Sequence, residues 1–188
     1  QDALDVVREG STEREVAQAI DQIIGAKGFE RTAFETIVAA GPNSALPHAH
    51  PTTRLLQRGD LVILDFGGVF EGYCVDMSRT VTVGPATSTA CRLHHAVREA
   101  QLMAMAAAAP GAPLSDVDGA ARRSLSRHGL AEKFGHGTGH GLGIDVHELP
   151  RISRSAVPVP QLTERDFVTA GMVFTIEPGV YLPGYGGV

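Results

Sequence analysis

Apolar residues recur at helical spacing in three parts of the chain. Isoleucine and valine repeat every three or four residues between 16 and 24, directly after a capping box at 12–15. Two later patterns end at proline or glycine, and Ser115 with Asp118 three residues on marks the start of the last one. The spacing predicts amphipathic helices at 12–24, 87–109 and 115–128.

Three short apolar runs predict β-strands, at 36–40, 61–64 and 172–176. The run at 61–64 has no polar interruption, which is typical of a strand that is buried on both faces. Helices and strands alternate along the chain without the glycine fingerprint of a nucleotide-binding turn. This order predicts a single α+β domain in which helices pack on a curved sheet.

The composition of the 188-residue chain is that of an ordinary globular protein, with 43% hydrophobic and 20% charged residues. No apolar run approaches the roughly 20 residues that a membrane-spanning helix needs. The net charge of -5 gives no reason to expect nucleic acid or an anionic membrane as a partner. The two cysteines lack a paired spacing, so we expect a reducing, cytoplasmic location.

A weak internal repeat relates the two halves of the chain. When Asp65 is aligned with Glu177, each acid follows an apolar run and precedes a glycine by two residues. A Gly-Tyr pair also follows each acid, at 72–73 and at 184–185. The repeat favours a domain that is built from two related halves.

Asp65 and Asp76 flank a segment that has the pattern of a β-hairpin. With a turn near 70–72, the two acids fall opposite one another, with Cβ atoms about 4.5–5.5 Å apart. Carboxylates at that separation repel, so either one holds a proton or a cation lies between them, and metal ions about 3.5–4 Å apart suit such a pair. Alternatively, Asp76 pairs with Arg79 and Asp65 only caps a turn, and these residues alone do not decide between the two interpretations.

Three histidines, His136, His140 and His147, lie within residues 134–148. Five glycines in that stretch argue against a helix, and therefore against the zinc-binding pair of an HExxH helix. A lone histidine is more often structural than a ligand, but an open backbone with several histidines lets a ligand or substrate approach closely. Further candidates of similar chemistry are His48, His50 and Glu177.

Six short motifs follow one another along the chain, at 43–48, 64–67, 72–80, 136–141, 147–150 and 175–181. Each is ordinary alone, but in this order they resemble the pita-bread metallopeptidases, which include aminopeptidase P, proline dipeptidase and methionine aminopeptidase. The Pro-His, His-Gly-Thr-Gly-His and Glu-Pro-Gly-Val-Tyr sequences are similar to the proline-specific branch. The resemblance implies two pseudo-symmetric halves, with helices packed on a curved antiparallel sheet.

The resemblance also implies a metal centre. Asp65, Asp76, His140 and Glu177 correspond to the family's metal ligands, and Asp76 corresponds to a residue that bridges two divalent ions. Several carboxylates with one imidazole form a hard, oxygen-rich ligand set. We therefore expect two Mn²⁺ ions, with Co²⁺ or Zn²⁺ as alternatives.

The same resemblance implies that four residues act on the substrate. His48 and His147 correspond to outer histidines that meet the substrate and the developing oxyanion, and His136 corresponds to a residue that lines the substrate pocket. Glu177 additionally corresponds to the group that shuttles a proton from the attacking water. The implied substrate is a peptide or dipeptide with proline at its second position.

The chain departs from the family pattern at its end. The family's second bridging glutamate follows shortly after the Glu-Pro-Gly-Val-Tyr motif, but no acid occurs after Glu177. The chain also opens without methionine. We expect residues 1–188 to be a metallopeptidase catalytic domain that is truncated at both ends, lacking an N-terminal domain and a last strand. Such a chain should bind two metals weakly, and the full-length form should be a homodimer.

Two functions of different classes remain open from the sequence. The first is a metal-dependent exopeptidase that hydrolyses the bond before proline with a metal-bridged water, as an Xaa-Pro aminopeptidase or an Xaa-Pro dipeptidase. The second is a pita-bread domain that has lost catalysis and acts as a binding module, although relatives of that kind typically lose the ligands that this chain retains. A metal-free, creatinase-like hydrolase is a third alternative, against which the intact Asp65, Asp76 and Glu177 argue.

Overall fold

The computed structural model describes residues 2–46, 49–154 and 163–188. Contacts divide the chain into two compact units: unit 1 comprises Gln1–His94 and Tyr181–Val188, and unit 2 comprises His95–Val180. Both units combine helices with antiparallel strands, which confirms the predicted α+β class. None of the described helices has both the length and the apolar character that crossing a bilayer requires.

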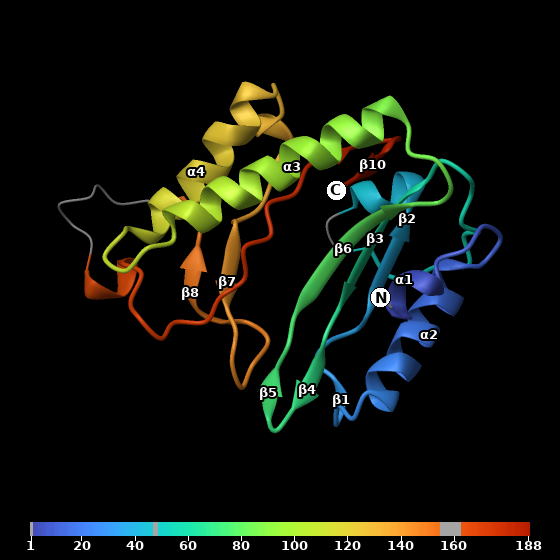
Figure 1. Ribbon diagram of the computed structural model, residues 1–188, viewed down its shortest axis with the longest axis horizontal. Coiled ribbons are helices and arrows are strands. Elements are labelled where there is room, and N and C mark those ends of the chain that lie inside the picture. The colour runs from blue at the N-terminus through green and yellow to red at the C-terminus, as the bar shows by residue number, and fades with distance from the viewer. Residues whose placement is uncertain (1, 47–48, 155–162) are drawn as a thin grey trace. The chain divides into compact units, whose positions relative to one another are not determined.

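Unit 1 is built around an antiparallel sheet with the strand order β2 (Ile37–Ala40), β3 (Leu61–Phe66) and β6 (Met77–Thr82) (Figure 1). β3 is the central strand and is hydrogen-bonded on both sides. Val62 and Leu64 of its apolar run have no exposed surface, whereas Ile63 is only partly buried, so the predicted burial of both faces is incomplete. Because the main chain of β3 is paired on both sides, the ladder fixes the position of Asp65 near the end of the strand.

The helix α2 (Glu13–Ala26) packs its apolar side against this sheet (Figure 1). Its N-terminus has the predicted capping box: the Thr12 hydroxyl accepts the Glu15 amide, and the Glu15 carboxylate accepts the Thr12 amide. The shared core of the helix and the sheet contains Val16, Ile20, Ile24, Val38, Val62 and Leu64.

β3 leads into a hairpin that consists of β4 (Gly68–Phe70) and β5 (Tyr73–Cys74), and β1 (Arg31–Thr32) pairs with β4. The turn residues Glu71 and Gly72 have φ angles of 50° and 80°. Positive φ at both central positions is what a two-residue type I′ turn requires, and its twist matches that of the flanking strands.

The predicted pairing of Asp65 with Asp76 is wrong, and the position of this turn explains why. Asp65 lies opposite Ser78. The centre of the turn falls between Glu71 and Gly72, one residue later than predicted, and such a displacement moves the pairing by two residues. Because side chains alternate along a strand with a period of two, the correction preserves the side of the sheet to which a residue points.

Unit 1 is completed by four short elements: α1 (Asp2–Asp5), the 3₁₀-helix η1 (Gly41–Ala45), β9 (Tyr181–Leu182) and β10 (Gly186–Gly187). β9 and β10 form an antiparallel pair. The Gly187 amide donates to the Ser44 hydroxyl at 2.9 Å, so the last residues of the chain are tied to η1.

The described residues of unit 2 form one complete long helix and several short elements: α4 (Leu114–Arg127), η2 (Ala131–Lys133), β7 (Gly139–Gly141), β8 (Glu148–Ile152) and η4 (Glu164–Asp166). The long helix α3 (Ser88–Ala107) enters unit 2 after His94. β7 and β8 pair antiparallel, and their register shifts between His140 and Gly141. α4 packs against β8 (Figure 1).

The predicted start of the third helix is wrong. α4 begins at Leu114, and its N-cap position is Pro113, which makes no side-chain capping bond. Asp118, which the sequence places in the first turn, is instead fully buried and forms an ion pair with Arg122. The four-residue spacing puts both side chains on one side of the helix, and that side faces inward.

The predicted strand at 172–176 is also wrong as a regular element. Within the described chain, this stretch forms a single β-bridge, between Phe174 and Gly141. The amides of Thr175 and Glu177 donate to carbonyl oxygens of the β7 region, but the His140 amide donates to the Thr175 hydroxyl, so the backbone ladder is incomplete.

Candidate metal centre

Asp65 and Asp76 are the two candidate ligands of unit 1. Asp65 belongs to β3, and its Oδ1 accepts a hydrogen bond from the Ser78 hydroxyl at 3.0 Å. Asp76 lies between β5 and β6 and is partly buried. Both acids therefore belong to the continuous segment from β3 to β6. The main-chain hydrogen bonds of these strands restrict where the two carboxylates can lie.

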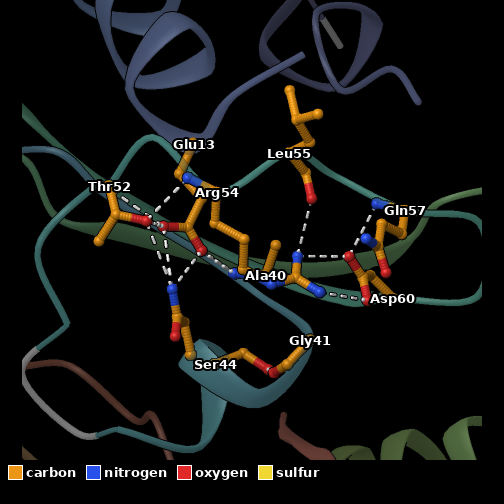
Figure 2. Close-up of polar contacts among 10 residues, drawn as sticks. Glu13, Ala40, Gly41, Ser44, Thr52, Arg54, Leu55, Gln57 and Asp60 are labelled. Atoms are coloured by element: carbon orange, nitrogen blue, oxygen red, sulfur yellow. Dashed lines mark hydrogen bonds and ion pairs between the residues drawn. The ribbon is translucent and has the colours of Figure 1, made fainter. Parts of the chain in front are cut away.

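A buried carboxylate, Glu13, ties together separate parts of unit 1 (Figure 2). It accepts the Ala40 amide at 2.7 Å, Asn43 Nδ2 at 3.1 Å, and the Thr52 amide and hydroxyl at 3.0 and 2.5 Å. The sequence does not reveal this role, because an acid in the first turn of a helix is usually explained by the helix dipole. Glu13 fixes both ends of the segment at 43–52.

This segment contains two of the predicted histidines. His48 lies outside the described residues. His50 is exposed, and its Nδ1 lies 2.8 Å from Glu35 Oε2. Just beyond the segment, Arg54 forms a two-pronged pair with Asp60 at 2.6 and 3.0 Å (Figure 2), and this carboxylate raises the pKa of Arg54.

In unit 2, His140 offers one ring nitrogen to a ligand. Its Nδ1 lies 2.9 Å from the carbonyl oxygen of Gly141, and because a carbonyl oxygen only accepts, Nδ1 carries the hydrogen. Its Nε2 lies 3.2 Å from Glu177 Oε1. An unprotonated Nε2 presents its lone pair to a carboxylate oxygen, and only a proton or a cation can make that contact favourable.

Glu177 is held by two neighbours in unit 2. Its amide donates to the carbonyl oxygen of Thr138 at 2.8 Å, and its Oε1 accepts the Thr175 hydroxyl at 2.7 Å. The Thr175 hydroxyl also accepts the His140 amide at 3.0 Å, so one side chain connects both candidate ligands. A side chain on Gly139 would collide with the carbonyl oxygen of Thr175, which explains the need for glycine beside His140.

The other two histidines of the glycine-rich stretch have different surroundings. The ring of His147 is exposed and lies against that of His140, with centroids 4.4 Å apart and planes at 66°. His136 donates from Nδ1 to the carbonyl oxygen of Gly137 at 2.7 Å and meets Phe134 edge-on at 4.9 Å. His136 also lines a pocket of about 450 Å³ within unit 2.

Two residues that the sequence analysis did not select as functional, Asp118 and Arg122, hold this stretch from α4. Their ion pair has a distance of 2.7 Å between Nε and Oδ2. Arg122 donates to the carbonyl oxygen of His136, and Asp118 accepts the hydroxyl of Thr138. An Asp and an Arg four residues apart resemble an ordinary surface pair, so only burial distinguishes them.

The donor atoms of each unit suit a divalent cation. Unit 1 offers the oxygens of Asp65 and Asp76, and unit 2 offers Nε2 of His140 with a carboxylate oxygen of Glu177. The Nδ1 contact of His140 places a hydrogen on Nδ1 and turns Nε2 toward the Glu177 carboxylate, an orientation that is usual for metal-binding histidines. Carboxylate oxygens and a single imidazole suit manganese, cobalt or zinc.

Solved structures support the fold class. A prolidase from Thermococcus sibiricus is 44% identical, with a TM-score of 0.92 over 99% of this chain and 49% of that chain. An X-Pro aminopeptidase from Thermotoga maritima is 37% identical, with a TM-score of 0.91 over 99% of this chain and 51% of that chain. The similarity to prolidase and aminopeptidase structures confirms the predicted pita-bread class.

A comparison of sequences finds relatives of the same kind as the solved structures. An Xaa-Pro dipeptidase from Pyrococcus horikoshii is 39% identical over 186 residues, which cover 99% of this chain and 51% of the relative. The chain thus spans about half the length of the curated relatives that it matches. The model of metallopeptidase family M24 matches residues 1–188, and the chain belongs to that family.

Proposed function

We propose that the protein is a metal-dependent exopeptidase that hydrolyses the peptide bond before proline, as an Xaa-Pro dipeptidase or an Xaa-Pro aminopeptidase. The observation that carries the proposal is the approach of His140 Nε2 to the Glu177 carboxylate in a chain of family M24. The relatives described above are an Xaa-Pro dipeptidase, a prolidase and an X-Pro aminopeptidase.

In this proposal, Asp65, Asp76, His140 and Glu177 would hold two divalent cations, with Asp76 as the ligand that both cations would share. When bound, such cations polarise the peptide carbonyl and promote loss of a proton from water. The oxygen-rich donor set favours Mn²⁺, with Co²⁺ and Zn²⁺ as alternatives.

The remaining roles belong to Glu177 and to three histidines. Glu177 accepts the proton of the attacking water, and the Thr175 hydroxyl at 2.7 Å keeps that carboxylate oriented. His147, exposed beside the His140 ring, donates to the developing oxyanion together with His48. His136 lines the pocket that receives the substrate.

The test of the proposal is a cleavage assay on the natural full-length protein with added Mn²⁺. The substrates are Xaa-Pro dipeptides, longer peptides with proline at the second position, and matched peptides with alanine in place of proline. We expect cleavage only of proline-containing substrates, and the length preference separates the dipeptidase from the aminopeptidase. Cleavage of the alanine peptides alone would contradict the specificity.

A matched pair of variants connects the assay to the site. We expect His140→Ala to abolish turnover, while His94→Ala, which removes an exposed histidine on α3, leaves it unchanged. A wild-type protein that binds no divalent metal and cleaves none of the peptides would instead support the binding-module alternative.

Two further properties complete the proposal. The proposed location is cytoplasmic, because the two cysteines of the sequence, Cys74 and Cys91, lack the paired spacing of a disulfide framework. The full-length protein is proposed to be a homodimer, and light scattering of the purified protein measures its mass directly. A monomer at micromolar concentration would contradict that part of the proposal.

A further inference from the structure

The ion pair of α4 lies in the interior of unit 2. The side chain of Asp118 is 0% exposed and that of Arg122 is 15% exposed. Arg122 uses Nε and Nη2 toward the two carboxylate oxygens, at 2.7 and 3.2 Å. Burial of two charges is expensive, and a buried pair often contributes little net stability. The contacts that the pair makes with other residues are therefore more informative than the pair itself.

Those contacts reach three alternate residues of the glycine-rich stretch. Arg122 donates from Nη1 to the carbonyl oxygen of Phe134 at 3.1 Å and from Nη2 to that of His136 at 2.5 Å. Its guanidinium also lies 4.3 Å from the centre of the Phe134 ring. Asp118 Oδ1 accepts the hydroxyl of the fully buried Thr138 at 2.8 Å. One helix thus holds residues 134–138 through charged hydrogen bonds.

Thr138 connects the ion pair of α4 to both candidate ligands of unit 2. Its amide donates to the carbonyl oxygen of Ile152 at 2.7 Å, and its carbonyl oxygen accepts the Glu177 amide at 2.8 Å. His140 follows two residues later and is connected to the Glu177 side by Thr175. Displacement of Thr138 would therefore move the imidazole and the carboxylate of the site together.

We propose that Asp118 and Arg122 are positioning residues that set the places of His140 and Glu177, and of His136 on the pocket. The glycines at 135, 137 and 139 give this stretch wide conformational freedom and no side chains to pack, so it needs anchors from elsewhere. Support by charged hydrogen bonds from a neighbouring helix supplies them. The inference rests on the proposed function only in taking His140 and Glu177 as metal ligands.

The test compares Arg122→Gln with Arg123→Gln in the natural full-length protein. Arg123 is the exposed neighbour on the same helix, so the control removes the same charge without touching the glycine-rich stretch. We expect Arg122→Gln to raise amide hydrogen exchange at least about tenfold at 134–141 and 174–178, with no change in α2. We also expect it to weaken Mn²⁺ binding by about 10- to 100-fold, the usual effect of losing a group that orients metal ligands.

A second, more conservative variant tests the same inference in case Arg122→Gln does not fold. Thr138→Val keeps the shape of the side chain and removes only the hydroxyl that Asp118 accepts. It should give a smaller rise in exchange at 174–178 and a Mn²⁺ affinity lowered by about 3- to 10-fold, the effect of one lost hydrogen bond. A purely structural role would lower the melting temperature while leaving the Mn²⁺ affinity of the folded protein unchanged.

The hydrogen-exchange measurement separates this inference from the proposed function, because it needs neither metal nor substrate. If the wild-type protein bound no Mn²⁺ but Arg122→Gln still loosened 134–141 and 174–178, the proposed function would fail and the positioning role would stand. Equal exchange in Arg122→Gln and Arg123→Gln would overturn the inference, whatever the protein hydrolyses.

Discussion

Asp65 in unit 1 and Glu177 in unit 2 offer the same chemical group on different supports. Asp65 belongs to β3, whose main chain is bonded by β2 on one side and β6 on the other. Glu177 lies outside the described strands and is held by Thr138 and Thr175. A hydroxyl donates to each acid, from Ser78 at 3.0 Å and from Thr175 at 2.7 Å.

The difference indicates which substitutions each unit can tolerate. A strand ladder is made by backbone groups, so replacing a neighbouring side chain leaves the position of Asp65 largely intact. The position of Glu177 depends on a backbone bond to Thr138, whose own side chain is held by the pair of Asp118 and Arg122. We therefore expect remote side chains in unit 2 to affect the site more than remote side chains in unit 1.

The largest expected effect comes from removing a carboxylate of either unit. Asp76→Ala and Glu177→Ala should each lower Mn²⁺-dependent turnover of an Xaa-Pro substrate by at least about a thousandfold, which corresponds to about 4 kcal/mol in the barrier. The control, Asp116→Ala, removes an exposed acid from α4. Retained turnover in only one of the two variants would show that a single unit supplies the chemistry.

The next largest effect is a loss of stability in unit 1. It tests whether the strand ladder holds Asp65 in place without the contacts of Glu13. Glu13→Ala removes the buried acceptor of the Ala40, Asn43 and Thr52 donors and should lower the free energy of unfolding by about 2–4 kcal/mol. Chemical denaturation measures this loss. We expect the Mn²⁺ affinity of the folded variant to remain within about threefold of the wild type, because the ladder around Asp65 is retained.

The matched control for Glu13 is Glu15, two residues later on the same helix. Glu15 is exposed and only completes the capping box, so Glu15→Ala should lower the free energy of unfolding by about 0.5–1 kcal/mol. Equal losses from the two variants would contradict the role that the buried contacts assign to Glu13.

A smaller effect separates the two hydroxyls that donate to the acids. Thr175→Val removes a donor to Glu177 and an acceptor for the His140 amide, whereas Ser78→Ala removes one donor to Asp65. With about 0.5–1.5 kcal/mol for each hydrogen bond, we expect a loss of Mn²⁺ affinity of about tenfold or more for Thr175→Val and about threefold for Ser78→Ala. Isothermal titration calorimetry with Mn²⁺ measures the affinity of both variants. A larger loss for Ser78→Ala than for Thr175→Val would contradict the stronger dependence of unit 2 on side-chain contacts.

The smallest effect concerns an exposed ion pair of unit 2. Arg127 and His128 donate to Glu99 and lower its pKa to about 2. Because the folded-state pKa is depressed, any stabilisation is present above the unfolded pKa of about 4.3 and is lost as the pH falls toward 2. We expect Arg127→Gln to raise the pKa of Glu99 in an NMR titration and to leave turnover at neutral pH unchanged. A turnover loss like that of Arg122→Gln would remove the distinction between buried and exposed pairs.

The elements with strong local signals could be predicted from the sequence. The helix at 13–26 has a capping box and a regular apolar side, and the strand at 61–66 begins with an unbroken apolar run at 61–64. Both signals lie within a few consecutive residues, so no knowledge of distant contacts is needed. The family could also be predicted, because six short motifs keep their order along the chain, and the match to the family model confirms it.

Features that depend on distant partners could not be predicted. The burial of Asp118 and Arg122 results from contacts with 134–138, which no local pattern encodes. The same holds for Glu13, whose partners lie 27 to 39 residues away. The register of the Asp65 hairpin depends on a turn at Glu71, a residue that seldom adopts positive φ.

The most direct test of the central claim is the location of the metal. Crystals of the natural full-length protein that are grown with Mn²⁺ and measured near the manganese absorption edge reveal each ion by its anomalous signal. We expect peaks about 2.0–2.3 Å from carboxylate oxygens of Asp65, Asp76 and Glu177 and from Nε2 of His140. A saturated crystal whose manganese peaks lie away from all four side chains would contradict the central claim.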